Sequence, residues 1–127
     1  MNGQGTQIAE RLKSPDPLNW LQGWYGAMCD GDWEHQQGIR LTTLDNPGWS
    51  LTVDLLATGL DELPPVAYCL SERSEHDWIG FKTDSGQWRG ACGPLNLTEL
   101  IAAFRAWAEP HLEPADLSQA DSPEVIQ

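Results

Sequence analysis

The sequence predicts a single α+β domain, in which an antiparallel sheet of about five strands carries two helices on one face. Three observations predict this class. A helical pattern of apolar residues stands near each end of the folded region, and the segment between them alternates apolar and polar residues. Turn signals rich in Pro, Gly, Asn and Asp separate the alternating runs. Because the connections are short, successive strands are expected to pair antiparallel.

The first helix is expected at residues 17–29. Asp16 can cap its N-terminus, and Pro17 suits the first helical position because proline lacks the N–H that a helix start leaves unbonded. Trp20 and Trp24 flank the face that we expect to be buried. That face is predicted by apolar residues at steps of three and four, which are Leu18, Leu21, Tyr25 and Met28.

Strands are expected at about residues 39–43, 49–55, 66–70, 78–83 and 87–92. The strongest turn signal between them is Asp45-Asn46-Pro47-Gly48, because proline presets one turn dihedral and glycine tolerates positive φ. If each strand pairs with its sequence neighbour, the loops alternate between the two ends of the sheet.

One end of this sheet is expected to be acidic. The meander brings together the loop that carries CDGDWEH (residues 29–35), the loop at residues 57–65 and the turn at residues 84–86. These three segments contain no Lys or Arg. Their acidic side chains are Asp30, Asp32, Glu34, Asp61, Glu62 and Asp84.

A second helix is expected at residues 97–109, with Asn96 as its N-cap and Glu99 at the reciprocal position of a capping box. Its predicted buried face consists of Leu97, Leu100, Ile101, Phe104 and Trp107. The folded domain then covers residues 16–109. A flexible segment at residues 1–15 and a disordered acidic tail at residues 110–127 are expected to flank it.

Composition limits the partners that such a domain can have. The chain of 127 residues carries 19 Asp and Glu against 7 Lys and Arg, a formal net charge of −12. Such a surface repels nucleic acid and anionic membranes and attracts a basic protein. No apolar run approaches the ~20 residues that span a bilayer, no signal peptide is visible, and the three cysteines form no CxxC pair. We therefore expect a cytoplasmic protein with reduced thiols.

The CDGDWEH segment combines residue types that serve ion binding and catalysis. Asp30, Asp32 and Glu34 match alternate positions of an EF-hand calcium loop. However, His35 stands where that loop needs glycine, and Leu41 stands where it needs a bidentate Glu. An EF-hand is excluded, and we expect neither a metal nor a cofactor.

The thiols and imidazoles offer further chemistry. A transition-metal site would need Cys29 and His35 to meet His76, and a capping thiol with surface imidazoles is the simpler interpretation. Carboxylates around Cys29 would raise its pKa, whereas Cys92 precedes a helix but has no His near it in sequence. A small enzyme that uses Cys92 or the CDGDWEH carboxylates remains an alternative.

Four local patterns stand out in order and spacing. They are WY at residues 24–25, GDWEH at residues 31–35, TLDNPGW at residues 43–49, and Glu72 followed by Asp77-Trp78. Together they resemble the immunity protein 53 family of bacterial polymorphic toxin systems, over about residues 20–108. The resemblance implies a small α+β cytoplasmic antitoxin that binds the toxic domain of a toxin encoded beside it. It implies no catalytic residue, because such proteins act by stoichiometric occlusion.

We expect the acidic end to bind a basic toxin. Trp33 can anchor a partner only if its ring is exposed, and a buried ring would merely fix the loop. An adaptor for another protein is a further alternative. A toxin gene beside this one would favour the antitoxin over the adaptor. The candidate contact residues are Asp30, Asp32, Trp33, Glu34, His35, Asp61 and Glu62.

Overall fold

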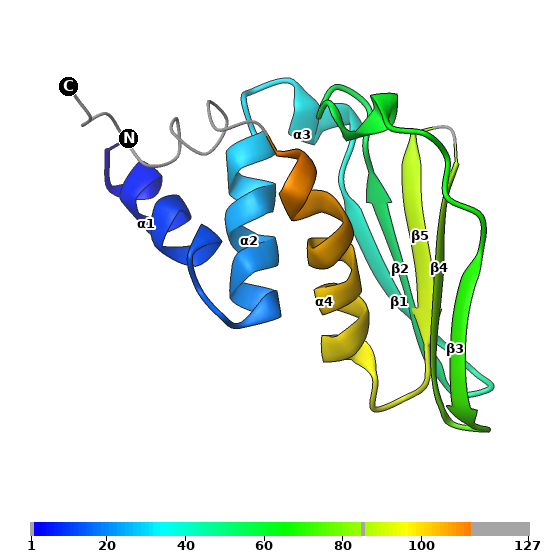
Figure 1. The fold of residues 1–127 in the computed structure, drawn as a ribbon. Coiled ribbons are helices and arrows are strands. Elements are labelled where there is room, and N and C mark those ends of the chain that lie inside the picture. Colours follow the sequence, from blue (N-terminus) through cyan, green and yellow to red (C-terminus); the bar gives the residue numbers. More distant parts are fainter. Residues whose placement is uncertain (1, 85, 113–127) are drawn as a thin grey trace.

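The computed structural model describes residues 2–84 and 86–112. In this part of the chain, a five-stranded antiparallel sheet forms one layer and the helices cover one of its faces (Figure 1), which confirms the predicted α+β class. The elements are α1 (Asn2–Leu12), α2 (Pro17–Met28), α3 (Trp33–Gln36), β1 (Ile39–Leu44), β2 (Gly48–Asp54), β3 (Cys69–Ser74), β4 (Asp77–Asp84), β5 (Gln87–Cys92) and α4 (Leu97–Ala108), with 3₁₀ turns at Leu60–Glu62 and Glu109–His111.

The strand order is β1-β2-β5-β4-β3, and all neighbouring strands are antiparallel. The prediction that every strand pairs with its sequence neighbour is wrong for β2 and β3, because β2 pairs with β5. The long connection at residues 55–68 carries the chain across to the far edge, where β3 begins later than expected. Residues 66–68 still run beside β4, since Val66 and Thr83 exchange two hydrogen bonds of 2.7 and 3.1 Å.

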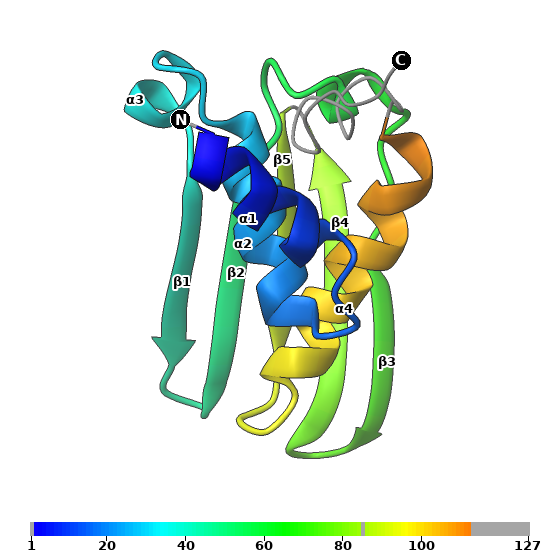
Figure 2. The same ribbon diagram turned by 90° about the vertical axis from the view of Figure 1, so that its left-hand side faces the viewer.

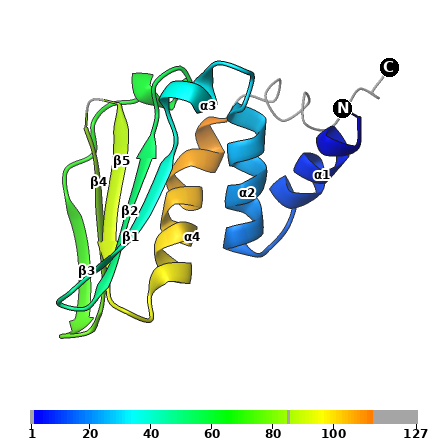
Figure 3. The same cartoon turned by 180° about the vertical axis from the view of Figure 1, so that it is seen from behind.

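The helices are layered outward from the sheet, as Figures 1 and 3 show. α4 lies against β4 and β5, α2 packs on α4, and α1 packs on the outer side of α2. α2 and α4 each match a predicted helix to within one residue. Among the described residues, no helix combines the length and the apolar character that crossing a membrane requires.

Residues 1–15 were expected to form a flexible segment outside the folded domain, whereas residues 2–12 form α1, which packs on α2. Two glycines of α2 allow α1 to approach closely. A Cβ atom at Gly23 would lie 3.1 Å from the Ile8 carbonyl oxygen, and one at Gly26 would lie 3.1 Å from the Ile8 side chain. Leu12 is buried in this contact. The predicted tail lies outside the described residues from residue 113 onward.

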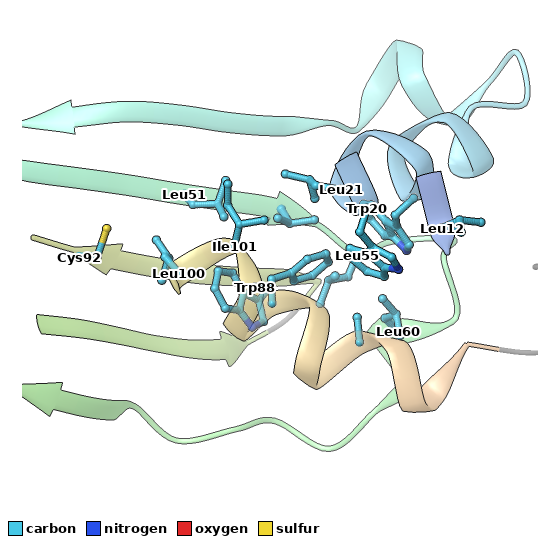
Figure 4. Close-up of a cluster of buried hydrophobic side chains, with 14 of the residues drawn as sticks. Leu12, Trp20, Leu21, Leu51, Leu55, Leu60, Trp88, Cys92, Leu100 and Ile101 are labelled. Carbon is cyan, nitrogen blue, oxygen red and sulfur yellow. The ribbon is translucent and has the colours of Figure 1, made fainter. Parts of the chain in front are cut away.

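The core lies between the sheet, α2 and α4 and is rich in tryptophan (Figure 4). Phe104 of α4 is at its centre, with the rings of Trp20, Trp24 and Trp88 at centroid distances of 6.0, 5.3 and 5.3 Å. All four side chains are almost completely buried. Such tilted and edge-to-face aromatic contacts add to the free energy of apolar burial.

The buried face of α2 differs from the predicted one. Trp20 and Trp24, expected to flank that face, are its most buried side chains, at 0% and 1% exposure. Leu18 and Tyr25, expected to be buried, are 53% and 39% exposed. The helix is thus rotated about its axis relative to the prediction, because the two indoles offer more apolar area to Phe104.

Candidate functional site

Three acidic loops form one continuous surface at one end of the sheet. The Trp33 indole N–H donates to the Leu56 carbonyl oxygen at 2.9 Å, which joins the CDGDWEH loop to the β2–β3 connection. The Leu55 N–H donates to the Gly86 carbonyl oxygen at 2.7 Å, which joins that connection to the β4–β5 turn. The predicted grouping is therefore confirmed, although β2 pairs with a different strand, because the ends of β2 and β4, Asp54 and Asp84, both pair with Gln87 at the start of β5.

The CDGDWEH loop is held by its own carboxylates. Asp30 accepts hydrogen bonds from the backbone N–H groups of Trp33 and Asp32, both at 2.9 Å. These bonds hold the pKa of Asp30 below its ordinary value. Glu34 reaches back to accept from the N–H groups of Asp30 and Gly31, at 3.0 and 2.9 Å. The Asp30 and Glu34 carboxylates therefore cap the start of α3 and its preceding turn.

Trp33 belongs to the core. Its side chain is 5% exposed, and its ring packs edge-to-face on Trp24 and Tyr25, each at a centroid distance of 6.0 Å. A ring that is already covered cannot enter a pocket on another protein. Trp33 therefore fixes the loop, and we remove it from the candidate contacts.

Other candidates are free to meet a partner. Asp32, His35 and Glu62 are exposed, and Asp61 is half-buried. Within the described residues, the structure shows no hydrogen bond or ion pair from these four side chains. The acidic end therefore presents uncompensated charge on hydrogen-bonded, well-fixed loops.

A depression of about 210 Å³ lies beside Asp61. Asp61 and Asp84 line it together with an apolar wall, and Asp84 also has distant ion pairs of 3.9 and 3.8 Å with Lys82 and Arg89. An apolar wall with carboxylates suits a Lys or Arg side chain, because the aliphatic stem and the charged head each find a partner. Sequence reasoning found the carboxylates but missed this wall, which consists of Leu55, Leu60, Leu63 and Pro65, with Thr83 beside them.

A buried carboxylate supports this end of the sheet from below. Asp54, at the end of β2, accepts bonds from Arg40 at 3.0 and 3.2 Å, from the Gln87 amide at 2.9 Å and from the Gly38 N–H at 2.9 Å. Burial alone would raise the pKa of Asp54, but these hydrogen bonds outweigh it and hold the pKa below its ordinary value. The network locks β1, β2 and β5 in register where the acidic loops begin.

The thiols are poorly placed for nucleophilic chemistry. Cys92 is fully buried, and burial raises its pKa. The pKa of Cys29 is raised as predicted, first by burial and then by the Glu34 and Asp30 carboxylates. A hydrogen bond with the Tyr25 hydroxyl opposes this shift.

The residues suggested for a transition-metal site do not come together. Cys29 and His35 flank the acidic end, whereas His76 lies in the β3–β4 turn at the opposite end of the sheet. Across residues 2–84 and 86–112, no three His, Cys, Asp or Glu side chains are grouped so that they could hold a metal ion.

The TLDNPGW pattern lies at the opposite end of the sheet and serves the fold there. The Trp49 indole N–H donates to the Pro94 carbonyl oxygen at 3.1 Å, so this turn is tied to the start of α4. A Cβ atom at Gly48 would overlap the Cys92 carbonyl oxygen. These contacts are those of a structural turn.

The Glu72–Trp78 pattern also holds the opposite end together. The guanidinium of Arg73 donates to Asp77 at 2.8 Å and to Glu99 of α4 at 2.6 and 3.0 Å. Asn96 occupies the N-cap position of α4 but makes no side-chain cap bond. Its amide donates instead to Asp77 at 2.9 Å and Glu99 at 3.3 Å. The predicted capping box is therefore wrong, because Arg73 and Asp77 compete for the same groups.

Comparison with known proteins agrees with the motifs. Neither the curated proteins nor the solved structures gave a match to this chain. The family model of Immunity protein 53 matches residues 18–109, which span α2 to the end of α4. The match includes the acidic loops as well as the two structural patterns at the opposite end. This chain belongs to the immunity protein 53 family.

Proposed function

We propose that this chain is a cytoplasmic antitoxin, which binds the toxic domain of a bacterial polymorphic toxin and neutralises it by stoichiometric occlusion. Family membership over residues 18–109 is the observation that carries this proposal. The geometry agrees with a binding role, because two of the three CDGDWEH carboxylates are used inside the molecule. Asp30 and Glu34 hold their own loop, and the Cys92 thiol is inaccessible to a substrate.

The acidic end is the surface that we propose faces the toxin. It combines the exposed carboxylates of Asp32 and Glu62 with the acid-lined depression beside Asp61 and Asp84. The cognate toxic domain should therefore present a basic surface. Opposite charges raise association rates by roughly 10- to 1,000-fold. Because the loops of the acidic end are already fixed by hydrogen bonds, binding costs less conformational entropy.

Titration of a toxin with the purified chain tests the proposed function. The toxic domain encoded beside this gene is the probe, and its activity is measured at increasing ratios of chain to toxin. Activity should fall linearly and end at one equivalent, because each antitoxin occupies one toxin. Inactivation at a small fraction of an equivalent would indicate an enzyme. Unchanged activity at several equivalents would contradict the proposal and favour an adaptor for another protein.

A further inference from the structure

A second surface adjoins the acidic end. An apolar groove of about 350 Å³ lies between α2 and the edge strand β1. Leu21, Gln22 and Tyr25 of α2 form one wall, and Gly38 and Ile39 form the other. These five residues carry no charge, and the groove is open to solvent rather than enclosed.

Exposed apolar side chains extend the groove along both walls. Leu18 continues the α2 stripe one turn before Leu21, and it is 53% exposed. Leu41 lies two residues after Ile39 on the same face of β1, and it is 46% exposed. Tyr25 is also 39% exposed. Three of the large apolar residues that the described chain exposes are thus gathered along this one groove.

The two edges of the sheet differ in a way that points to a docking surface. Figure 2 shows β1 and β3 on either side of the helical layer. On the helix-facing side, β3 presents Cys69 and Ser71, paired with Phe81 and Ile79, whereas β1 presents Ile39 and Leu41. A strand edge that is exposed and apolar favours association with another chain. The β3 edge also carries a register shift near Glu72, which discourages strand pairing.

Charge indicates which kind of chain fits. Gly38 ends the acidic CDGDWEH loop and also lines the groove, and Tyr25 contacts both the groove and the Trp33 ring. Residues 29–38 contain three carboxylates and no Lys or Arg. A second copy of this chain, with its own net charge of −12, would be repelled from this position.

We propose that the α2–β1 groove receives a segment of the toxin that carries large apolar side chains next to Lys or Arg. This inference rests on the proposed function and assigns a second part of the same interface. The apolar side chains would fill the groove between Leu18, Tyr25 and Leu41, and the neighbouring basic residues would face Asp32. Apolar contacts in the groove slow dissociation, because they must be broken before the complex separates. The charges of the acidic end mainly speed association.

The test compares two double variants of the full chain. The groove variant is Leu18→Ser with Leu41→Ser, and the matched control is Leu70→Ser with Leu95→Ser. All four leucines are exposed, at 53%, 46%, 53% and 94%, so both variants remove equivalent side chains without a change of charge. Surface plasmon resonance against the toxic domain encoded beside this gene gives both rate constants, and circular dichroism checks folding.

The groove variant should dissociate roughly 10- to 100-fold faster, with an association rate within about threefold of wild type. The control should stay within about twofold for both rates. If the groove variant dissociates no faster than the control, this inference is overturned while the proposed function stands. If wild type does not bind the toxic domain, both fail.

A further variant tests the groove if Leu41→Ser, in the edge strand β1, prevents folding. Gln22 is exposed and lines the groove, so Gln22→Lys places a positive charge against the expected basic segment without loss of apolar packing. Gln7→Lys on α1 is its control, because Gln7 is also exposed. Gln22→Lys should weaken binding at least tenfold more than Gln7→Lys. Equal affinities would overturn the proposal, as would a wild-type dimer that the groove variant dissociates without any change in toxin binding.

Discussion

The indole N–H of Trp33 donates a hydrogen bond to the carbonyl oxygen of Leu56 at 2.9 Å. This bond joins the loop before β1 to the connection after β2. Trp33→Phe keeps an aromatic ring in the core but removes this bond. We expect the free energy of unfolding to fall by about 1–3 kcal/mol, from the lost bond and the smaller ring. Urea denaturation measures it. A normal stability with weaker toxin binding would show that Trp33 is a contact residue.

Two aspartates in the same loop should differ in their effect on stability. Asp30 accepts two backbone hydrogen bonds, whereas the Asp32 side chain is exposed. Asp30→Ala should lower the free energy of unfolding, as the loss of a cap does. Asp32→Ala should change it by less than about 0.5 kcal/mol. Equal losses in thermal or urea unfolding would mean that Asp30 does not cap the loop.

The Asp54 network predicts a dependence of stability on pH. The pKa of Asp54 is lower in the folded chain than in the unfolded one, so the carboxylate stabilises the fold above its unfolded pKa. Asp54→Asn should lower the free energy of unfolding by about 1–2 kcal/mol at pH 7, since Arg40 is half-exposed and partly screened.

The difference between wild type and Asp54→Asn should stay constant from pH 7 to about pH 5 and shrink below about pH 4. Urea denaturation at several pH values measures this difference. A gap that widens on acidification would mean that burial, rather than the hydrogen bonds from Arg40, Gln87 and Gly38, controls the pKa of Asp54.

The TLDNPGW turn should be sensitive to a single added methyl group. A Cβ atom at Gly48 would overlap the carbonyl oxygen of Cys92, whereas nothing lies within 4 Å of the position that a Cβ atom would take at Gly38. Gly48→Ala should therefore cost about 1–3 kcal/mol of unfolding free energy, and Gly38→Ala should be neutral or stabilising by up to about 1 kcal/mol. Thermal unfolding of both variants is the measurement. A harmless Gly48→Ala would contradict the close contact between the start of β2 and the end of β5.

Local signals were sufficient to locate most elements from the sequence. Asp16 and Pro17 mark the start of α2, and the Asn19 N–H indeed donates to the Asp16 carboxylate at 3.0 Å. Strict alternation located β2 and β5 to within a residue, because each pairs on both sides and is half-buried along its length. The acidic end was predictable for the same reason, since strand direction determines where each loop lies.

Non-local contacts decided the remaining features. The pairing of β2 with β5 depends on a long crossover that no local pattern encodes. α1 depends on Gly23 and Gly26 of another helix for its packing. The face that α2 buries depends on Phe104 of α4, because Trp20 and Trp24 make ring contacts with it. The α2–β1 groove was missed as a consequence, because Leu18 and Tyr25, which the structure leaves exposed, match a buried helical stripe in sequence.

The central claim is that the acidic end meets a basic toxin, and association kinetics test it most directly. The loop variant combines Asp32→Asn, Asp61→Asn and Glu62→Gln, none of which holds the loop. The charge-matched control combines Asp45→Asn, Glu72→Gln and Glu75→Gln, which are exposed at the opposite end of the sheet. Both variants are compared with wild type by surface plasmon resonance against the adjacent toxic domain, at low and at physiological salt.

The loop variant should associate roughly tenfold more slowly than wild type at low salt and lose most of its salt dependence, with an unchanged melting temperature. The control should keep most of the rate and the salt dependence, because its charges lie on the far side of the molecule. Equal slowing in both variants would show that only net charge matters. Slowing confined to the control would place the toxin at the Glu72–Asp77 end and contradict the assignment of the acidic end.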